Sequence, residues 1–589
     1  MLNYSVAELR NMKKFTFLLV AVLVWVAAAS AQDAQSLLSF NWAHSIDGGT
    51  SAGDNIFDMA KSKDGSYFMA NSFSTTNQSR GVNFDSEPLV GVDGNAIQGS
   101  PYTGTSNNAN LLLQKVSNTG SVEWSAYTKK GDISDAFLAS TSDGGLIVTL
   151  KTRAWVEEAG LDNILEYVDA AGATTTIKDM NTQASEYRFL VLKIDADGKL
   201  VWSRLINGLV RTDTKYATKN NAYVYSCVVD DADNIYLAGN YRTELYFKKS
   251  DGSKETLVSK NAANWNGDSQ GTVGDLFLVK LDKNGYFSKS LLADGTASLA
   301  FFDKMAYADG KIYVDGRVQG DGTTMTLGGK AVNASTERQT QILLSVNTED
   351  LSVNYVNALT SVANNSNRFV LQNKAAQYIN GDVYFTGLLN GGFRAEGATT
   401  DLINSNAAML KPYVLKVNPA TGEVAQAAIR TEGGIGGFYG VYEGKDKLYA
   451  FGYDMSAGAV LVPINKSDFS LESATVVCKY GTVSVCGTPL ADGGNLILAN
   501  RGRVTQSPVF FGTDKSFANL QNWGVVYYSY KINDTATGIN EINSDAQAAK
   551  VNVYSTDGIF IKTASSVESA KQGLPRGTYV IGNHKIAID

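Results

Sequence analysis

Two short patterns alternate along most of this chain, and each occurs seven times. The first is an apolar run followed by Lys, an aliphatic residue, a polar turn and a second strand-like run, as in FLVLKIDADGKLVW at 189–202. The second is a polar turn followed by a strand-like run, as in DADNIYLAGNY at 231–241. Self-similarity of this kind indicates a repeat architecture, in which each unit buries its apolar faces against its neighbours.

The copies are evenly distributed, with a mean spacing of about 69 residues between the anchors of the first pattern. Copies of the first pattern lie at 110–124, 189–202, 275–287, 341–355, 412–425, 459–473 and 525–534. Copies of the second lie at 63–73, 142–150, 231–241, 308–318, 379–389, 444–453 and 491–501. Their Asp-Gly and Asn-Gly pairs supply the positive φ angles of tight hairpin turns, and alternating apolar and polar residues beside the turns predict half-buried strands.

Each unit therefore reads as four strands joined by two tight turns and one longer connection. Four-stranded units repeated in tandem are typical of a β-propeller, so we expect an all-β fold of about seven blades over residues 32–534. The composition agrees, because the chain holds 56 Gly, only 8 Pro, 29 Tyr and 24 Phe. Aromatic residues favour strands, and many glycines favour short strands joined by tight turns.

The ends of the repeat region predict how the ring closes. The last unit runs into a polar linker after Asn533 and lacks its fourth strand. Residues 36–46 (SLLSFNWAHSI) resemble the fourth strands of other units, because Trp42 matches Trp124 and Trp202. We expect this N-terminal segment to complete the seventh blade beside Tyr528, which would remove the exposed sheet edges.

Two segments, 189–206 and 227–241, resemble the bacterial SBBP-type β-propeller repeat. The resemblance covers roughly residues 36–534, closely in the second and third blades and loosely in the fourth to seventh. It implies the same propeller fold and leaves the exact number of blades open.

The N-terminus predicts export. Lys13 and Lys14 precede an apolar run, and small residues lead to a cleavage site between Ala31 and Gln32, so residues 1–31 are expected to be a signal peptide starting at Met12. No Cys follows the run, which excludes an acylated lipoprotein terminus. The alternative is a membrane anchor, but the run is short for a spanning helix.

The C-terminus reads as a separate element. A polar linker at 535–549 precedes a β-rich tail at 550–589 with an Asp557-Gly558 turn. The tail resembles the C-terminal sorting domain of Bacteroidota type IX secretion substrates at Val553-Tyr554, Gly558, Gly573-Leu574, Gly577, Tyr579 and the final run 585–588. The resemblance implies a secreted or cell-surface protein and a secretion machinery as a partner. A β appendage without export function, with a periplasmic protein, is the alternative.

The bulk charge and the cysteines exclude several classes. A net charge of −7 without a basic cluster argues against nucleic-acid binding. The three cysteines cannot form a framework of disulfides. Cys478 and Cys486 would pair only if their segment folds back as a hairpin, and otherwise we expect three buried thiols, Cys227 included.

No catalytic, cofactor or metal site is predicted. The two histidines, His44 and His584, lie in separate elements and cannot build a histidine metal site. The segment 49–53 matches G-x-S-x-G, but it precedes a strand, whereas the nucleophile elbow precedes a helix. The acidic runs 195–198 and 230–233 suggest turn residues more than calcium ligands, because a distal Glu is absent.

The longer connections between second and third strands indicate where a ligand would bind. They span roughly 75–109, 153–187, 244–273 and 390–411, and we expect them to lie on one face of the ring. The candidate ligand-face aromatics in them are Tyr102, Trp155, Tyr167, Tyr187 and Trp265. Exposed aromatics of this kind contact sugars or proteins, and the alternative is that they pack onto the blades.

Two functions stay open at this point. The first is a secreted or surface binding propeller without enzymatic activity, whose ligand is an extracellular glycan or protein. The second is an extracellular carbohydrate-active enzyme that uses carboxylates near the central channel. Two acids and an Arg or Lys in one pocket would favour the enzyme, and a broad aromatic surface would favour the binding protein.

Overall fold

The computed structural model describes the repeat region and the C-terminal tail, with gaps in the longer connections. The described residues are 37–47, 55–73, 83–85, 87–90, 97, 110–129, 131–154, 165–177, 188–208, 222–260, 274–295, 299–319, 324–333, 339–362, 370–404, 409–479, 485–486, 490–492, 495–503, 508–517, 523–533, 551–555, 560–564, 570–581 and 584–588. The predicted signal peptide at 1–31 and the predicted linker at 535–549 lie outside them.

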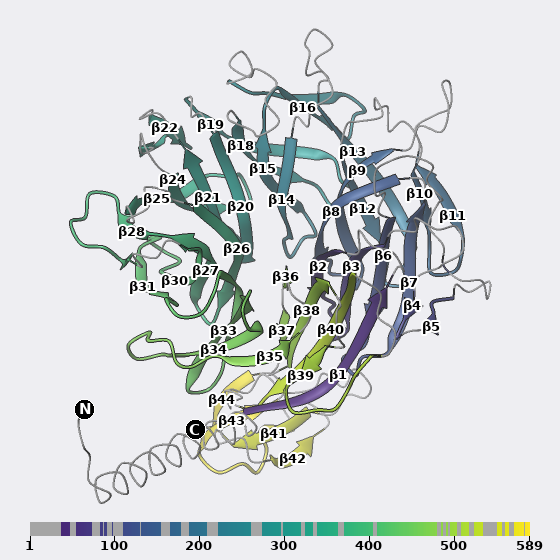
Figure 1. Ribbon diagram of the computed structural model, residues 1–589, viewed down its shortest axis with the longest axis vertical. Helices are drawn as coiled ribbons and strands as arrows, with labels where there is room; N and C mark the ends of the chain where they lie inside the picture. Colours follow the sequence, from purple (N-terminus) through teal and green to yellow (C-terminus); the bar gives the residue numbers. More distant parts are fainter. Residues whose placement is uncertain are drawn as a thin grey trace, which may run out of the picture.

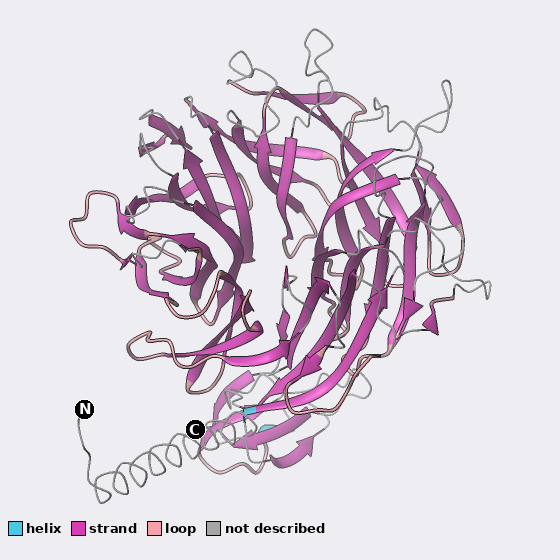
Figure 2. Cartoon of the chain, in the orientation of Figure 1, coloured by secondary structure: helices cyan, strands magenta, loops and turns pink. Residues whose placement is uncertain are grey.

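Seven antiparallel sheets are arranged around a common centre, which confirms the all-β propeller and gives seven blades (Figures 1 and 2). Blade 1 is β2 (Asn55–Lys61), β3 (Tyr67–Phe73), β6 (Asn110–Val116) and β7 (Val122–Lys129). Blade 2 is β8 (Gly131–Ser140), β9 (Leu146–Ala154), β12 (Arg188–Ile194) and β13 (Leu200–Gly208). Blade 3 is β14 (Ala222–Val229), β15 (Ile235–Tyr241), β18 (Asp275–Leu281) and β19 (Phe287–Asp294).

The remaining blades continue the same order around the ring. Blade 4 is β20 (Leu299–Ala308), β21 (Lys311–Gln319), β24 (Gln339–Asn347) and β25 (Val353–Val362). Blade 5 is β26 (Val370–Ile379), β27 (Asp382–Asn390), β30 (Lys411–Val417) and β31 (Val424–Ile429). Blade 6 is β32 (Gly436–Glu443), β33 (Lys447–Asp454), β34 (Gly458–Asn465) and β35 (Thr475–Lys479). Blade 7 is β36 (Val485–Cys486), β37 (Leu490–Asp492), β38 (Asn495–Arg503), β40 (Trp523–Ile532) and β1 (Leu38–Asp47).

The N-terminal strand closes the ring as the sequence predicts. β1 pairs with β40 in antiparallel register, with Trp42 opposite Ser529 and Ala43 opposite Tyr528. The backbone amide of Asn533 also donates to the carbonyl of Leu37 at 2.7 Å. The last blade is thus built from both ends of the repeat region, and opening the ring would require breaking this whole ladder of hydrogen bonds.

The core lies between neighbouring blades. One apolar cluster joins Leu113 of blade 1 to Leu190 of blade 2, and others join the next pairs of blades in the same way. The middle strands β3, β6 and β15 are buried along their whole length. The alternation expected of half-buried strands is therefore wrong for these strands, because both of their faces are covered by adjacent sheets.

The lysine of the first pattern is tied to the turn of the second. Lys115 Nζ lies 2.5 Å from Asp64 Oδ2, and Lys193 Nζ lies 2.7 Å from Asp143 Oδ1. In blade 5 the same pair is Lys416 with Asp382. Each pair joins the third strand of a blade to the turn between its first two strands. The ion pair therefore links the two patterns in blades 1, 2 and 5.

The fourth-strand aromatics lock each blade to the next one. Trp42 Nε1 donates to the carbonyl of Asn118 at 3.1 Å, and Trp124 Nε1 donates to the carbonyl of Ala196 at 2.9 Å. Both acceptors lie in the turn between the third and fourth strands of the following blade. A glycine with positive φ completes each turn, Gly120 at +90° and Gly198 at +82°, and leaves room for the indole ring. The Trp that recurs in these fourth strands thus serves packing between neighbouring blades.

The described parts of the long connections at 75–109, 153–187, 244–273 and 390–411 pack along the outer edges of the blades. In each of them the described part is a hairpin that pairs with the outer strand of the preceding blade. The hairpins are β4 (Asn83–Phe84) and β5 (Glu87–Pro88) on β1, β10 (Leu165–Val168) and β11 (Thr174–Ile177) on β7, β16 (Glu244–Lys248) and β17 (Lys254–Val258) on β13, and β28 (Gly392–Ala395) and β29 (Ile403–Asn404) on β25.

Two connections that the sequence did not single out do the same. The hairpin of β22 (Thr324–Leu327) and β23 (Lys330–Asn333) extends β19, and β39 (Val509–Phe510) extends β35. A chain segment that pairs with the blade before its own satisfies part of an open sheet edge. It also ties the two blades together through backbone hydrogen bonds.

The tail and the cysteines complete the comparison with the sequence. The tail forms its own sheet in the order β42 (Phe560–Ala564), β41 (Val551–Ser555), β43 (Gly577–Ile581) and β44 (His584–Ile588). The hairpin that would pair Cys478 with Cys486 does not form, because they lie on β35 and β36 in different blades. Cys227 and Cys478 are both buried. Within the described part of the chain, no helix has the length and apolar character needed to cross a membrane.

Candidate functional site

The inner strands of six blades carry a β-bulge near the same position. A bulge adds one unpaired residue to a strand and re-aims its side chain, and bulges often lie beside functional sites. The extra residues are Phe57, Ser134, Tyr225, Asp303, Lys374 and Tyr439. The inner strands border the centre of the ring in Figure 1. The bulges therefore form a girdle of varied side chains around this centre.

Three aromatic rings of blades 3 and 4 lie in a row on this girdle. Tyr223 and Tyr225 of β14 are stacked with centroids 5.9 Å apart, and Tyr225 meets the edge of Phe301 of β20 at 5.8 Å. All three side chains are partly exposed. We call Tyr223, Tyr225 and Phe301 the aromatic strip. Such a row presents aromatic carbon and phenol groups together, a combination found where proteins contact sugars.

Cationic side chains flank the aromatic strip at both ends. Lys151 Nζ lies 4.4 Å from the centroid of Tyr223, and the guanidinium of Arg242 lies 5.5 Å from the same ring. At the other end the guanidinium of Arg317 lies 4.8 Å from the centroid of Phe301. Cation–π contacts at these distances hold the rings and cations in one array. The array draws residues from blades 2, 3 and 4.

Arg317 is held in place by a buried network that reaches into blade 5. Its Nε and Nη2 donate to Asp303 at 2.7 and 3.1 Å, and its Nη1 donates to the carbonyl of Leu371 at 2.7 Å. Asn373 Nδ2 donates to Asp303 Oδ2 at 2.9 Å, and the hydroxyl of Tyr413 donates to Asn373 Oδ1 at 2.6 Å. A two-pronged Arg–carboxylate pair with these extra bonds is rigid. The network fixes the end of the aromatic strip.

The carboxyl groups of this region are mostly unavailable to a ligand. Asp303 is only 4% exposed and Asp315 is fully buried. Burial, and then the neighbouring Asp303, raise the pKa of Asp315 well above its usual range. Asp58 accepts from the backbone amides of Met59 and Leu138, both at 2.9 Å. These acids therefore act as structural acceptors.

Two titratable groups differ from this pattern. Burial raises the pKa of Asp135 to about 6, against the attraction of Lys304 and Lys151. Burial, together with Lys304, lowers the pKa of Lys374 to about 8. Both side chains are partly exposed on the inner strands. Their charges consequently change within two units of neutral pH.

The residues predicted from sequence are placed elsewhere or lie outside the described part. Tyr167 is fully buried, and its hydroxyl donates to the carbonyl of Gly198 at 2.9 Å. Its prediction as an exposed ligand-face aromatic is wrong, because the outer hairpin packs it between blades 1 and 2. The other candidates, Tyr102, Trp155, Tyr187 and Trp265, and the cleavage-site residues Ala31 and Gln32, lie outside the described residues.

The sequence reasoning missed the aromatic strip because it followed long loops. The signal that would have revealed it is the inner strand itself, where AYVYS at 222–226 and AFFDK at 300–304 place aromatic and charged residues just before the turn patterns. His44 lies outside the aromatic strip, at the edge of blade 7. Its Nδ1 is 2.7 Å from Asp85 Oδ2, and its ring stacks on Phe84.

The turn residues behave as turn acceptors. Asp195 Oδ1 accepts from the amides of Asp197 and Lys199 at 3.0 and 2.8 Å. Asp230 Oδ1 accepts from the amides of Ala232 and Asn234 at 2.9 and 2.8 Å. These bonds confirm that the acidic runs shape turns. The segment 49–53 lies outside the described residues, and β2 follows it, so the helix of a nucleophile elbow is not formed there.

Comparison with known proteins adds three distant structural likenesses. No protein-family model and no curated protein matches the sequence. Polysaccharide lyase Uly1 matches with a TM-score of 0.34 and 11% identity, over 84% of this chain and 98% of that chain. A quinohemoprotein alcohol dehydrogenase from Comamonas testosteroni matches with a TM-score of 0.32 and 11% identity, over 85% of this chain and 77% of that chain. Trypanosoma rangeli sialidase bound to the inhibitor DANA matches with a TM-score of 0.23 and 7% identity, over 82% of this chain and 89% of that chain. At these scores the likenesses carry no argument about activity or ligand.

Proposed function

We propose that this protein is an exported, non-enzymatic binding propeller whose aromatic strip takes an acidic glycan. The single observation that carries the proposal is the array of three partly exposed rings between Lys151 and Arg242 at one end and Arg317 at the other. The rings suit sugar faces, and the cations suit carboxylate or sulfate groups on them. Export rests on the sequence of residues 12–31 alone.

The charge balance supports an anionic ligand. The cationic side chains of the inner girdle are Lys151, Arg242, Lys304, Arg317 and Lys374. Of the acids beside them, Asp315 is buried with a raised pKa, and Asp303 and Asp58 are occupied by hydrogen bonds. These five cations outnumber the four neighbouring carboxyl groups, which are Asp58, Asp135, Asp303 and Asp315. A ligand therefore meets a small excess of positive charge at this site, although the whole chain carries −7.

Binding measurements on the mature chain test this proposal. We expect polyuronates or sulfated oligosaccharides to bind, and neutral oligosaccharides of equal length to bind at least tenfold more weakly. Tyr225→Ala should weaken binding about tenfold, because stacking on one ring contributes about 1–2 kcal/mol. The matched control is Tyr307→Ala, near the other end of β20, whose hydroxyl donates to Asp231 at 2.7 Å. Equal loss in both variants would contradict the site.

One observation favours the enzyme as a second candidate. Asp135 is partly exposed and has a pKa raised to about 6, which is the property of a carboxylic acid that donates a proton near neutral pH. Incubating the chain with acidic polysaccharides and measuring new reducing ends tests this candidate. Cleavage by the wild type that is lost in Asp135→Asn would replace the binding proposal with the enzyme.

A further inference from the structure

The polar network between blades 4 and 5 holds two carboxyl groups and one guanidinium. Asp303 of β20 pairs with Arg317 of β21, and Asp315 lies two residues before Arg317 on the same face of β21. Asp315 is fully buried, and its Oδ1 accepts from the amide of Lys304 at 2.9 Å. Its Oδ2 is buried without a hydrogen-bond partner in the described part of the chain. Leaving a buried acceptor unpaired costs free energy, so this oxygen needs an explanation.

The direction of the other side-chain hydrogen bonds in this network is fixed. Arg317 can only donate, so Asp303 accepts from it, and Asp303 also accepts from Asn373 Nδ2. Asn373 therefore turns its Oδ1 the other way, where it accepts from the hydroxyl of Tyr413 at 2.6 Å and from Gln341 Nε2 at 3.3 Å. The amide of Gln341 is thereby oriented, because its nitrogen must face Asn373. Among the described residues, nothing donates to its buried Oε1.

Two buried acceptors are thus left without a donor on one face of blade 4. Gln341 of β24 lies directly opposite Arg317 in the antiparallel register, so it is the diagonal neighbour of Asp315 on the same face of the sheet. A hydrogen on Asp315 Oδ2 turns one of the two acceptors into a donor for the other. An ionised Asp315 would instead leave both acceptors unpaired and would place two negative charges beside one guanidinium.

The surrounding charges agree with a proton at this position. The titratable groups around the network are Asp303 and Lys304 on β20, Arg317 on β21, Lys374 on β26 and Tyr413 on β30. Burial, and then Asp303, raise the pKa of Asp315, against the attraction of Lys304 and Arg317. The single guanidinium is already committed to Asp303, so it does not compensate a second carboxylate.

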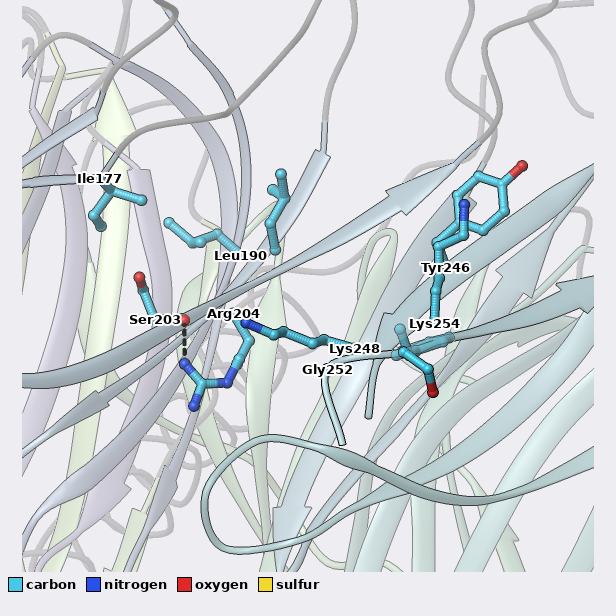
Figure 3. A pocket seen from close by; sticks show the side chains of 11 residues that line it. Ile177, Leu190, Ser203, Arg204, Tyr246, Lys248, Gly252 and Lys254 are labelled. Atoms are coloured by element: carbon cyan, nitrogen blue, oxygen red, sulfur yellow. Dashed lines mark hydrogen bonds between the residues drawn. The ribbon is translucent and has the colours of Figure 1, made fainter. Parts of the chain in front are cut away.

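Charged groups on the outside of the ring are not constrained in this way. Lys248 and Lys254 line a pocket beside the outer strand of blade 2, and both side chains are exposed (Figure 3). Water satisfies the donors of such side chains, so they need no partner within the protein. Asp315 differs because the fold removes it from water completely.

We propose that Asp315 carries a proton in the folded chain, and that this proton keeps Arg317 available to a ligand. Arg317 has five N–H donors, of which Asp303 and the carbonyl of Leu371 use three, so two remain for an anion at the end of the aromatic strip. An ionised Asp315 would compete for these donors and would repel an anionic ligand. The role in ligand binding rests on the proposed function, whereas the proton itself does not.

Infrared difference spectroscopy on the mature chain tests for the proton directly. At neutral pH the wild type should show the carbonyl stretching band of a protonated carboxylic acid that Asp315→Asn lacks. Asparagine fits the same space and supplies a donor from Nδ2, so this variant should fold. Asp135→Asn is the matched control, because it removes a different inner-strand acid and should leave the Asp315 band in place. A spectrum that Asp315→Asn does not change would overturn the proposal.

Thermal unfolding against pH gives an independent measurement. The folded chain holds a proton that the unfolded chain releases, so the wild type should lose stability as the pH rises above the ordinary range of a carboxyl group. Asp315→Asn removes this loss, and its unfolding midpoint should exceed that of the wild type by a margin that grows from about pH 5 to about pH 8. Asp303→Asn removes the partner of Arg317 instead and should lower the midpoint throughout this range. A margin for Asp315→Asn that does not grow with pH would contradict the proton.

Calorimetric titration with oligogalacturonate tests the role of the proton in ligand binding. At neutral pH Asp315→Asn and the wild type should bind equally, because both present a neutral side chain with a donor. At alkaline pH, where the infrared band of Asp315 disappears, the wild type should bind more weakly than Asp315→Asn. Weaker binding by Asp315→Asn at neutral pH would overturn this role. Absence of binding by the wild type would contradict the proposed function, and the spectra and unfolding midpoints would still decide whether the proton is present.

Discussion

Ring closure depends on a close contact between Trp42 and Gly120, and a single methyl group tests it. Gly120 has φ +90°, and a Cβ at this position would lie 2.7 Å from Trp42 Cγ and 3.0 Å from His44 Nε2. Gly65 of the same blade has φ +85° and nothing within 4 Å of its Cβ position. The two turns are matched, because Gly120 and Gly65 donate to the carbonyls of Ser117 and Ser62 at 3.0 and 3.2 Å.

The two glycines should therefore differ in one contribution only. Alanine at either position forces a side chain into the left-handed region, which costs about 1–2 kcal/mol. At Gly120 the methyl group also overlaps a buried indole ring, and overpacking of this kind costs about 1–3 kcal/mol more. Gly120→Ala should thus lower the free energy of unfolding by about 2–5 kcal/mol, against about 1–2 kcal/mol for Gly65→Ala.

Urea denaturation followed by tryptophan fluorescence measures the difference as a shift in midpoint at an unchanged slope. A double-mutant cycle with Trp42→Ala assigns it to the contact, because the loss in Trp42→Ala/Gly120→Ala should be smaller than the sum of the single losses. Equal midpoints for Gly65→Ala and Gly120→Ala would refute the reasoning. Additive losses in the cycle would show that the extra cost arises elsewhere.

Three further predictions follow from ring closure and from the charged groups. Removing residues up to Asp47 leaves the edge of β40 unpaired, so size-exclusion chromatography should show aggregates where the complete mature chain elutes as a defined species. Burial opposes ionisation of Asp135 and raises its pKa to about 6 in the folded chain. Asp135→Asn should therefore unfold at a higher temperature than the wild type at pH 8. The difference in unfolding temperature should vanish below about pH 4, where Asp135 is protonated in both the folded and the unfolded chain. As the pH rises, acidic-glycan binding at the aromatic strip should weaken in two steps, near pH 6 as Asp135 ionises and near pH 8 as Lys374 loses its charge. A calorimetric pH series measures both steps. The absence of a step near either value would contradict the involvement of both groups.

The ion pairs within blades explain which sequence signals were reliable. Burial alone would raise the pKa of Asp64, but its bonds to Lys115 and to the Ser66 amide outweigh burial and lower the pKa to about 2. The pair forms in blades 1, 2 and 5, where it joins the two patterns of one blade. The propeller of about seven blades, its tight turns and the closing strand were predicted from the repeated patterns and their turn residues. Each depends on residues that are close in sequence or repeated.

The outer hairpins show why the exposure of Tyr167 was predicted wrongly. Tyr167 lies in a connection of blade 2, yet β10 pairs with β7 of blade 1. No local pattern in 153–187 specifies that partner, because backbone pairing carries little sequence information. The aromatic strip likewise depends on contacts between segments that are distant in sequence. Tyr225 and Phe301 are distant along the chain, and the bulges in β14 and β20 turn them toward each other.

The sequence alone determined the repeated unit, a number of units near seven and the strand that closes the ring, because turn residues and apolar runs act within one blade and recur along the chain. Only the tertiary structure decided which side chains gather at the centre and which connecting hairpins pair with the preceding blade. Those outcomes depend on how neighbouring blades meet, where a one-residue bulge or a hairpin that crosses to the preceding blade changes which side chains reach solvent.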